Sequence, residues 1–389
     1  MSALATTSPL LGVYRPPSPV LVSGHGTRVV DSGGREYLDF TSGIAVNALG
    51  HGHPTVVEAA RSALATGLLH TSNLFRTEPA AALAEWLVDR SFGDRVFFCN
   101  SGAEAVEGAL KFARRWATTV GGPERNGIVA FKGGFHGRTM GALSATDRPA
   151  YQAPFAPLVS RVQIVDPGDP HAVARAIGPE TAAVIVEPIQ AEGGVHEMGA
   201  DFLAGLRELC DDAGAALVFD EVQTGLGRTG LLWGHEWSGV APDLMALAKP
   251  LAGGLPMGAV VLAEHIADAI QPGDHASTFG GGPFVATVAL AVCEKIGSAE
   301  ILENVRRADA WLRERCARLV ERGRIVEARG RGLLWGLELG RPAAPVVDAA
   351  RARGLLVCTA GQDVLRLLPP LNTSLAELEE GVALLEEVL

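Results

Sequence analysis

Two short apolar runs in the middle of the chain each end on side chains that could do chemistry. Ala216-Ala-Leu-Val-Phe-Asp-Glu-Val-Gln-Thr-Gly225 carries Asp220 and Gln223, and Leu244-Met-Ala-Leu-Ala-Lys249 ends on Lys249. Apolar runs of this length, bounded by Gly and Pro, are typical of strands buried on both faces of a parallel sheet. Because ligands bind at the carboxyl ends of such strands, we expect the acid and the lysine to face one cleft.

This lysine and this acid suit one kind of cofactor. Burial disfavours the charged form of a lysine, so a neutral amine becomes available that can form a Schiff base with an aldehyde. A buried aspartate needs a cationic partner, and a protonated pyridine nitrogen is one. Lys249 and Asp220 could therefore serve pyridoxal phosphate. When this pair is taken alone, a structural ion pair between the two residues is the simpler interpretation.

Length and composition set the class of protein. The 389 residues are enough for two domains and a substantial core. With 48% hydrophobic and 20% charged residues, the chain has the composition of an ordinary globular protein. The net charge of -11, from 33 basic and 44 acidic residues, argues against partners such as nucleic acid or anionic membranes. This net charge is compatible with a local cluster of arginines that binds an acidic substrate.

The cysteines and histidines favour neither disulfides nor a metal. The five cysteines form no CxxC pair, and a sparse, odd set fits buried thiols in a reducing cytosol. They are Cys99, Cys210, Cys293, Cys316 and Cys358. His51 and His53 have no third histidine or acid nearby, so we expect no metal. We also expect no signal peptide within Met1 to Val20, and the apolar run from Pro250 to Ala263 is too short to cross a membrane.

The elements that must position these residues alternate between helix and strand from about residue 80. The pattern predicts helices over 79–89, 103–116 and 201–213, and strands over 95–99, 127–131 and 182–186. Such alternation predicts a parallel α/β sheet with helices on both faces.

The two ends of the chain read differently from its middle. Residues 1–20 read as a tail, and Arg28 to Phe40 reads as a β-hairpin around an Asp-Ser-Gly-Gly turn. From about residue 283 long helices dominate, with a few strands such as 332–339 and 355–358, which predicts a smaller C-terminal domain.

Two glycine-rich loops could hold a phosphate group. Asn100-Ser-Gly-Ala-Glu-Ala105 lies between a predicted strand and a helix, where free backbone N–H groups and the helix dipole favour an anion. An ordinary helix cap at Ser101 explains this stretch equally well when it is taken alone. Ser277-Thr-Phe-Gly-Gly-Gly-Pro283 adds hydroxyl groups to a second Gly-rich loop.

Gly225-Leu-Gly-Arg-Thr-Gly230 matches the GxGxxG fingerprint of dinucleotide-binding proteins, but we reject that interpretation. The fingerprint requires a helix directly after it and an acid at the end of the next strand. Here Trp233 and Trp237 follow in a loop, and Asp243 comes before its strand.

Other stretches carry groups that could hold a ring or a carboxylate. In Gly133-Gly-Phe-His-Gly-Arg-Thr-Met140, Phe135 could stack on a planar ring and Arg138 could bind a carboxylate; a surface loop is the alternative. Val186-Glu-Pro-Ile-Gln-Ala-Glu-Gly-Gly194 carries two acids after a buried strand, and a solvated loop would explain either alone. Arg366 has apolar neighbours and therefore should have an anionic partner.

Together these stretches resemble the class III pyridoxal-phosphate aminotransferases, and within them the acetylornithine and ornithine aminotransferases. The motifs occur in family order, and the resemblance runs from about Leu38 to Arg366. It implies the fold-type I architecture, an α/β fold with a large domain around a mostly parallel sheet and a smaller α+β domain. We accordingly predict a large domain over 51–282, and a small domain formed by 283–389 with the N-terminal segment 1–50.

The resemblance also implies roles around the cofactor. Lys249 would carry pyridoxal 5′-phosphate and then act as the base that moves the proton. Asp220 would pair with the pyridine nitrogen, and Gln223 would bond the ring hydroxyl. Val222 and Phe135 would pack on opposite faces of the ring. The phosphate would be held by Ser101, Gly102 and Ala103, together with Thr278 of the partner subunit in a homodimer with shared active sites.

For the substrates, the resemblance implies two carboxylate sites. Arg138 would bind the α-carboxylate of a donor that presents its distal amine, and Arg366 would bind the α-carboxylate of the acceptor 2-oxoglutarate. Glu192 would cover Arg366 while the donor reacts and swing away for the acceptor. Ser277 is grouped with these substrate-binding residues.

The activity that the resemblance implies is transfer of the distal amino group of N-acetyl-L-ornithine to 2-oxoglutarate in the cytoplasm, giving N-acetylglutamate semialdehyde and glutamate. The stretches 43–54 and 70–75 are most like this subgroup. Ornithine, succinylornithine, 4-aminobutyrate and a carrier-linked lysine are alternative donors. A catalytically silent regulatory protein of the same fold is an alternative of another class. The chain departs from the family pattern at Pro250, Ala191 and Gly282, and Pro250 predicts an extended backbone at Lys249.

Overall fold

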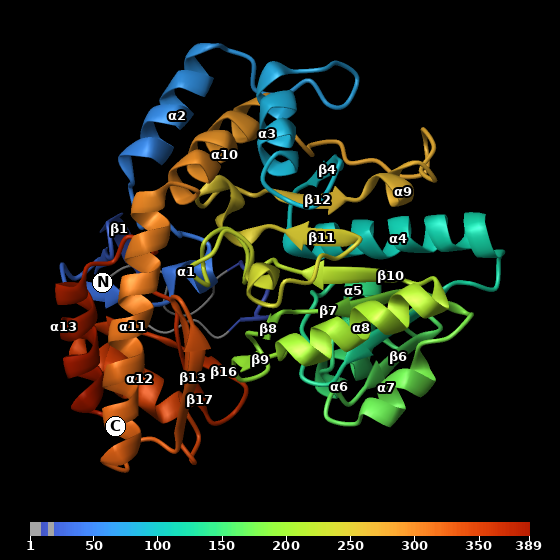
Figure 1. Cartoon of the computed structure of the whole chain (residues 1–389). Helices are drawn as coiled ribbons and strands as arrows, with labels where there is room; N and C mark the ends of the chain where they lie inside the picture. Colours follow the sequence, from blue (N-terminus) through green and yellow to red (C-terminus); the bar gives the residue numbers. More distant parts are fainter. Residues whose placement is uncertain (1–8, 15–18) are drawn as a thin grey trace.

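The computed structural model describes residues 9–14 and 19–389, so most of the predicted N-terminal tail over residues 1–20 lies outside the described residues. The chain forms a large α/β region and a smaller C-terminal region, beside which the N-terminal strands lie (Figure 1). Among the described residues, no helix combines the length and apolar character that crossing a membrane would require.

A seven-stranded sheet forms the centre of the large region. Its strands, in spatial order, are β4 (Arg95–Cys99), β12 (Gly258–Leu262), β11 (Leu244–Leu247), β10 (Ala216–Asp220), β7 (Thr181–Val186), β5 (Gly127–Phe131) and β6 (Val162–Val165). All neighbours are parallel except at β12, which runs antiparallel to both β11 and β4. The predicted mostly parallel sheet is therefore confirmed.

The strands are apolar throughout because both faces of the sheet are covered by helices. Along β10, Ala216 and Val218 face the core that α4 (Gly102–Gly121) and α5 (Met140–Ala145) complete. Leu217 and Phe219 point the opposite way, into the core of the other face. That face is covered by α7 (Pro170–Ala176) and α8 (Ala200–Ala213) (Figure 1).

Smaller elements connect and flank this sheet. The helix α10 (Pro283–Ile296) packs against α2 (Pro54–Ala65) and α3 (Glu78–Val88), at one end of the sheet (Figure 1). The short elements are α1 (Ser42–Ala45), α6 (Pro149–Gln152), α9 (Glu264–Ala267), the 3-10 helices η1 (Ala153–Phe155), η2 (Gly234–Trp237) and η3 (Lys249–Ala252), and the hairpin of β8 (Ile189–Gln190) and β9 (His196–Glu197).

Two four-stranded sheets form the smaller region. One has the order β1 (Leu21–His25), β2 (Arg28–Asp31), β3 (Glu36–Asp39) and β15 (Leu355–Leu356), and the other has the order β13 (Glu327–Arg331), β14 (Leu334–Glu338), β17 (Val364–Leu367) and β16 (Cys358–Ala360). The helices here are α11 (Ala299–Glu321), α12 (Ala344–Arg353) and α13 (Leu375–Glu386). Because β3 pairs with β15, the N-terminal segment is part of this region. The predicted hairpin is confirmed as β2 and β3.

The structure corrects three local predictions. The strand predicted over 355–358 is two strands, β15 and β16, which belong to different sheets. The apolar run from Pro250 to Ala263 contains a strand, β12, that the sequence analysis did not predict. Lys249 is not at the end of an extended strand: β11 ends at Leu247, and Lys249 begins η3.

Candidate active site

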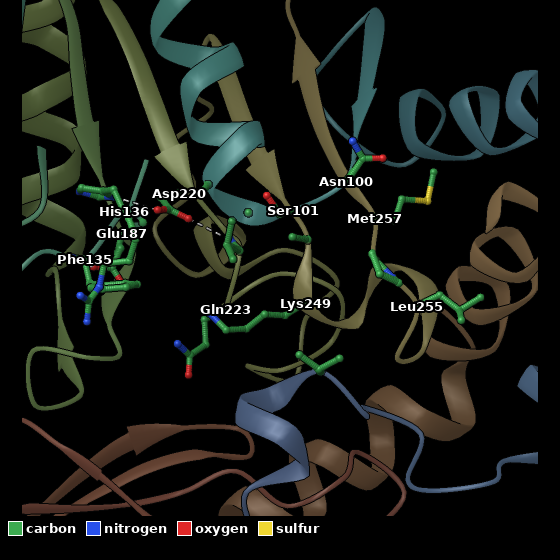
Figure 2. Close-up of a pocket in the computed structure, with 18 of the residues that line it drawn as sticks. Asn100, Ser101, Phe135, His136, Glu187, Asp220, Gln223, Lys249, Leu255 and Met257 are labelled. Atoms are coloured by element: carbon green, nitrogen blue, oxygen red, sulfur yellow. Dashed lines mark hydrogen bonds and ion pairs between the residues drawn. The ribbon is translucent and has the colours of Figure 1, made fainter. Parts of the chain in front are cut away.

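The carboxyl ends of β4, β5, β7, β10 and β11 meet at one edge of the sheet, beside a cavity of about 420 Å³. The residues that close or follow these strands line the cavity, so the expected cleft is present (Figure 2). Among the residues predicted to bind a cofactor or substrate, those that line it are Ser101, Gly102, Ala103, Phe135, Arg138, Asp220, Val222, Gln223 and Lys249.

Asp220 closes β10 and is held by two hydrogen bonds. Its side chain is 4% exposed. Its Oδ2 accepts a hydrogen bond from His136 Nδ1 at 2.8 Å, and its Oδ1 accepts one from the backbone N–H of Val222 at 3.1 Å (Figure 2). The carboxylate is therefore fixed beside the cavity, where it can pair with a cation on a ligand.

His136 is a residue of the site that the sequence analysis missed. Burial lowers the pKa of His136, but the hydrogen bond and charge of Asp220 outweigh it, so the pKa is raised overall. The contact with His136 also fixes the orientation of the Asp220 side chain. The motif around Phe135 signals a functional loop, but it does not indicate a contact between residues 84 positions apart.

Lys249 lies on the cavity wall with no hydrogen-bond or ion-pair partner among the described residues. Burial lowers the pKa of Lys249, and the nearby charge of Arg366 lowers it further. The carboxylates of Glu192 and Asp220 act in the opposite direction without reversing the shift. The neutral, nucleophilic amine is consequently more available than it is on an exposed lysine.

Glu187, the residue after β7, joins two loops at the cavity. Its Oε1 accepts a hydrogen bond from the N–H of Phe135 at 2.9 Å, and its Oε2 accepts one from the N–H of Ala191 at 3.3 Å. Burial raises the pKa of the Glu187 carboxyl to about 7. The alternative of a solvated loop is therefore wrong for this acid, which is 5% exposed. A single acid after a strand gives no indication of such burial.

The first turn of α4 forms an anion-binding corner of the cavity. Ser101 caps the helix, with its Oγ accepting a hydrogen bond from the N–H of Glu104 at 3.2 Å. Other N–H groups of a first turn have no intrahelical partner, and the helix dipole favours an anion there. Gly102 lets Val222 pack closely against this turn, because a Cβ at position 102 would lie 2.7 Å from Val222 Cγ1. The corner fits a phosphate group.

These features fit pyridoxal phosphate as a set. The helix N-terminus suits the phosphate, the fixed Asp220 carboxylate suits a pyridine nitrogen, and the unpartnered Lys249 amine suits an aldehyde. Phe135 and Val222 line the same cavity from two different loops and offer apolar surface to a ring.

Arg366, on β17, forms a buried ion pair with Glu192 at the site. Its side chain is 2% exposed, and its Nη1 donates to Glu192 Oε1 at 2.6 Å and to Gln223 Oε1 at 3.1 Å. Glu192 is thus the anionic partner that the burial of Arg366 led us to expect. Since Gln223 also lines the cavity, this ion pair lies directly beside it.

Arg138 offers a guanidinium group without a carboxylate partner in the described part of the chain. Its Cζ lies 3.5 Å from the ring centroid of Tyr151 and 5.8 Å from that of Phe135. The stacking on Tyr151 orients the planar group at the cavity wall. An exposed, oriented guanidinium can bind a substrate carboxylate through two hydrogen bonds.

Ser277 and Thr278 do not line this cavity. They line an adjoining hollow that shares Asn100 with it, where Ser277 Oγ accepts a hydrogen bond from Asn100 Nδ2 at 3.2 Å. Thr278 is exposed. The single chain therefore leaves Thr278 free for contact with another molecule, and its role in a partner subunit remains a prediction.

Comparison with known proteins identifies relatives along almost the whole chain. The family model described as "Aminotransferase class-III" matches residues 14–389. An acetylornithine aminotransferase from Gloeobacter violaceus is 47% identical over 374 residues, which is 95% of this chain and 93% of the relative.

Solved structures give the same result. The N-acetylornithine aminotransferase from Stenotrophomonas maltophilia is 40% identical with a TM-score of 0.85, and the match covers 96% of each chain. The ornithine aminotransferase from Toxoplasma gondii, whose structure contains PLP at partial occupancy in the active site, is 31% identical with a TM-score of 0.91. That match covers 97% of this chain and 91% of the other.

Proposed function

Because this chain belongs to the class III aminotransferase family, we propose that it transfers the distal amino group of N-acetyl-L-ornithine to 2-oxoglutarate, with pyridoxal phosphate as its cofactor. The products are N-acetylglutamate semialdehyde and glutamate, in a step of arginine biosynthesis. The 47% identity to an acetylornithine aminotransferase supports this donor. The observation that carries the proposal is the pair of arginines at the cavity: Arg138 is open, whereas Arg366 is covered by Glu192.

Each part of the cofactor has a set of residues that would hold it. The N-terminus of α4, with Ser101, Gly102 and Ala103, would bind the phosphate. Asp220, supported by His136, would pair with the pyridine nitrogen. Around the ring, the contacts would come from Phe135, Val222 and Gln223, and the covalent attachment from Lys249. When bound, the cofactor supplies an electron sink that stabilises negative charge on the carbon that bears the transferred nitrogen.

In the first half of the reaction, Arg138 would hold the α-carboxylate of the donor, so that the distal amine lies over Lys249. The Lys249 amine would also take the proton from the δ-carbon of the donor. In the second half, 2-oxoglutarate must place its α-carboxylate nearer the cofactor. Glu192 would then leave Arg366, and Arg366 would bind this carboxylate through two hydrogen bonds.

We expect Glu192→Ala to shift the donor preference toward α-amino acids. With Arg366 uncovered, the rate of the half-reaction with glutamate should rise about tenfold relative to that with N-acetylornithine. The measurement is the rate constant of each half-reaction, followed by the absorbance of the bound cofactor. Glu197→Ala, on the same hairpin, is the matched control, because Glu197 pairs with Arg331 and does not touch Arg366. An unchanged ratio in Glu192→Ala would contradict the switch.

The substrate is tested by the overall reaction. Purified enzyme loaded with cofactor is given 2-oxoglutarate and one of the candidate donors, and glutamate is measured. The proposal expects N-acetylornithine to give the highest kcat/KM among N-acetylornithine, ornithine, succinylornithine and 4-aminobutyrate. A higher value for another donor would reassign the substrate, and glutamate formation from none of them would favour a carrier-linked donor or a silent protein.

The enzyme is proposed to act as a homodimer. Large apolar side chains are exposed in the segment between α2 and α3, namely Leu69, Leu74 and Phe75, and Phe279 is exposed in the Gly-rich loop over 277–283. The rings of His70 and Phe279 lie 4.9 Å apart, so the two loops form one surface. A second copy that covers this surface would bring its Thr278 toward the phosphate corner of this chain.

Phe279→Glu is expected to weaken this dimer, because a charge would be buried in an apolar contact. Sedimentation velocity should show a larger monomer fraction, and activity should fall with dilution. Phe155→Glu is the control, since Phe155 is also exposed but lies on η1. A variant that stays dimeric at all concentrations would place the interface elsewhere.

Domain boundaries and location complete the proposal. We retain a large domain over 51–282 and a small domain of 283–389 with 1–50, supported by the pairing of β3 with β15. The helix α10, with which the proposed small domain begins, packs on α2 and α3, so the two domains would meet along this helix. All five cysteines are free thiols, which supports a cytoplasmic enzyme.

A further inference from the structure

Three residues of the C-terminal sheet form a row across its strands. Arg329 of β13 pairs in register with Gly336 of β14, and Gly336 pairs in register with Arg366 of β17. The row therefore includes the arginine that Glu192 covers.

The turn that carries Glu192 lies along this row. At one end, Arg329 Nε donates a hydrogen bond to the carbonyl of Gly194 at 2.8 Å. In the middle, Val195 is fully buried against Gly336, where an added Cβ would lie 2.9 Å from Val195 Cβ. At the other end, Arg366 Nη1 donates to the carbonyl of Ala191 at 3.1 Å. The turn between β8 and β9 thus contacts the sheet at both of its ends and in its middle.

Arg329 is itself rigidly held. Its Nη1 donates to Glu327 Oε2 and to Glu338 Oε2, both at 2.7 Å, and its side chain is 13% exposed. Because the two carboxylates that Nη1 binds fix the plane of the guanidinium group, they also fix the direction in which Nε donates. That direction is toward Gly194.

The large domain holds the same turn from the opposite side. Arg148 Nη2 donates to the carbonyl of Glu192 at 3.0 Å, and Glu187 accepts from the N–H of Ala191. The backbone of the turn is therefore anchored at three carbonyls around the Glu192 side chain, those of Ala191, Glu192 and Gly194. The Glu192 side chain, by contrast, is 28% exposed, and Arg366 is its sole hydrogen-bond and ion-pair partner among the described residues.

We propose that Arg329 is a positioning residue for substrate discrimination: it fixes the turn on the sheet that carries Arg366, so that the Glu192 side chain alone rotates between the two half-reactions. The inference rests on the proposed function, because it assumes that Glu192 controls access to Arg366. Arg329 does not line the cavity, and it would act through the backbone of Gly194. If it is lost, the Glu192 carboxylate should meet Arg366 less well and glutamate should compete better.

The test measures both half-reactions in Arg329→Gln and Arg329→Lys holoenzymes. The ratio of the glutamate rate to the N-acetylornithine rate should rise about three- to tenfold in both, the range expected from loss of one hydrogen bond. Lysine keeps the positive charge beside Glu327 and Glu338, but it cannot also donate to Gly194. Arg341→Gln is the matched control, since Arg341 donates to the carbonyl of Leu389, away from the hairpin. Its ratio should be that of the wild type.

A second background separates positioning from general damage. In Glu192→Ala enzyme, Arg329→Gln should leave the ratio unchanged, because there is no carboxylate left to position. An equal shift in both backgrounds, or no shift in either Arg329 variant, would overturn the inference. If Glu192→Ala alone does not alter the ratio, the proposed switch fails as well, which is a distinct result. Should the Arg329 variants fold poorly, Gly336→Ala is the second variant, because its added Cβ would push Val195 and the turn away from the sheet. It should also raise the ratio of the glutamate rate to the N-acetylornithine rate.

Discussion

Lys249→Ala is expected to reduce transamination by at least about 10⁴-fold, because it removes both the covalent attachment of the cofactor and the base that moves the proton. Lys249 is suited to both tasks, since it lines the cavity without a hydrogen-bond partner in the described residues and burial lowers its pKa. The measurement is the single-turnover rate with N-acetylornithine.

Borohydride reduction tests the covalent attachment of the cofactor to Lys249 separately from the role of Lys249 as a base. Reduction of the cofactor-loaded wild type should attach the cofactor to the peptide that contains Lys249, as seen by mass spectrometry, and the variant should give no such peptide. Lys132→Ala is the control, because Lys132 is an exposed lysine paired with Asp166. Labelling of another lysine in the wild type, or activity within tenfold of the wild type in Lys249→Ala, would refute the assignment.

Asp220→Asn is expected to lower the half-reaction rate about 10²- to 10³-fold, the usual cost of removing one group that stabilises developing charge. Asparagine keeps the shape of the side chain but loses the negative charge that would keep the pyridine nitrogen protonated. It also deprives His136 of its anionic partner at 2.8 Å, so the pKa of His136 should fall. NMR of the histidine ring reports that second change independently of activity.

The control for Asp220→Asn is Asp166→Asn, an exposed aspartate of the same charge. Asp220→Glu tests whether the charge or its place matters, and we expect it to recover part of the rate. A wild-type rate in Asp220→Asn, with cofactor fully bound, would show that the enzyme does not need an anion at this position.

The parts of the site that follow strands were predictable from the sequence. Asp220 and Lys249 come at or just after apolar runs, and in a parallel sheet such positions share one edge. Their place in one cleft therefore follows from the sequence pattern alone. The same local patterns gave β4, β5 and the cap at Ser101, because each depends on residues that are close in the chain.

The missed parts depend on contacts between distant segments. The pair of His136 and Asp220 forms because the loop after β5 meets the carboxyl end of β10, and no local pattern indicates that contact. The strand β12 was not predicted because its residues follow Gly and Pro, and because it is antiparallel to both of its neighbours. The contacts between the Glu192 turn and the C-terminal sheet depend on the register of β13, β14 and β17, which brings Arg329 and Arg366 into one row.

Absorbance of the cofactor-loaded enzyme during single half-reactions is the most direct test of the proposed donor. N-Acetylornithine, ornithine, 4-aminobutyrate and glutamate are each mixed with the enzyme, and the loss of the visible absorbance of the bound cofactor is timed. We predict that N-acetylornithine causes the fastest loss among the amine donors. Faster loss with ornithine or 4-aminobutyrate would contradict the proposed substrate while leaving the cofactor site in place, and loss with none of the four would contradict the proposed reaction with these donors.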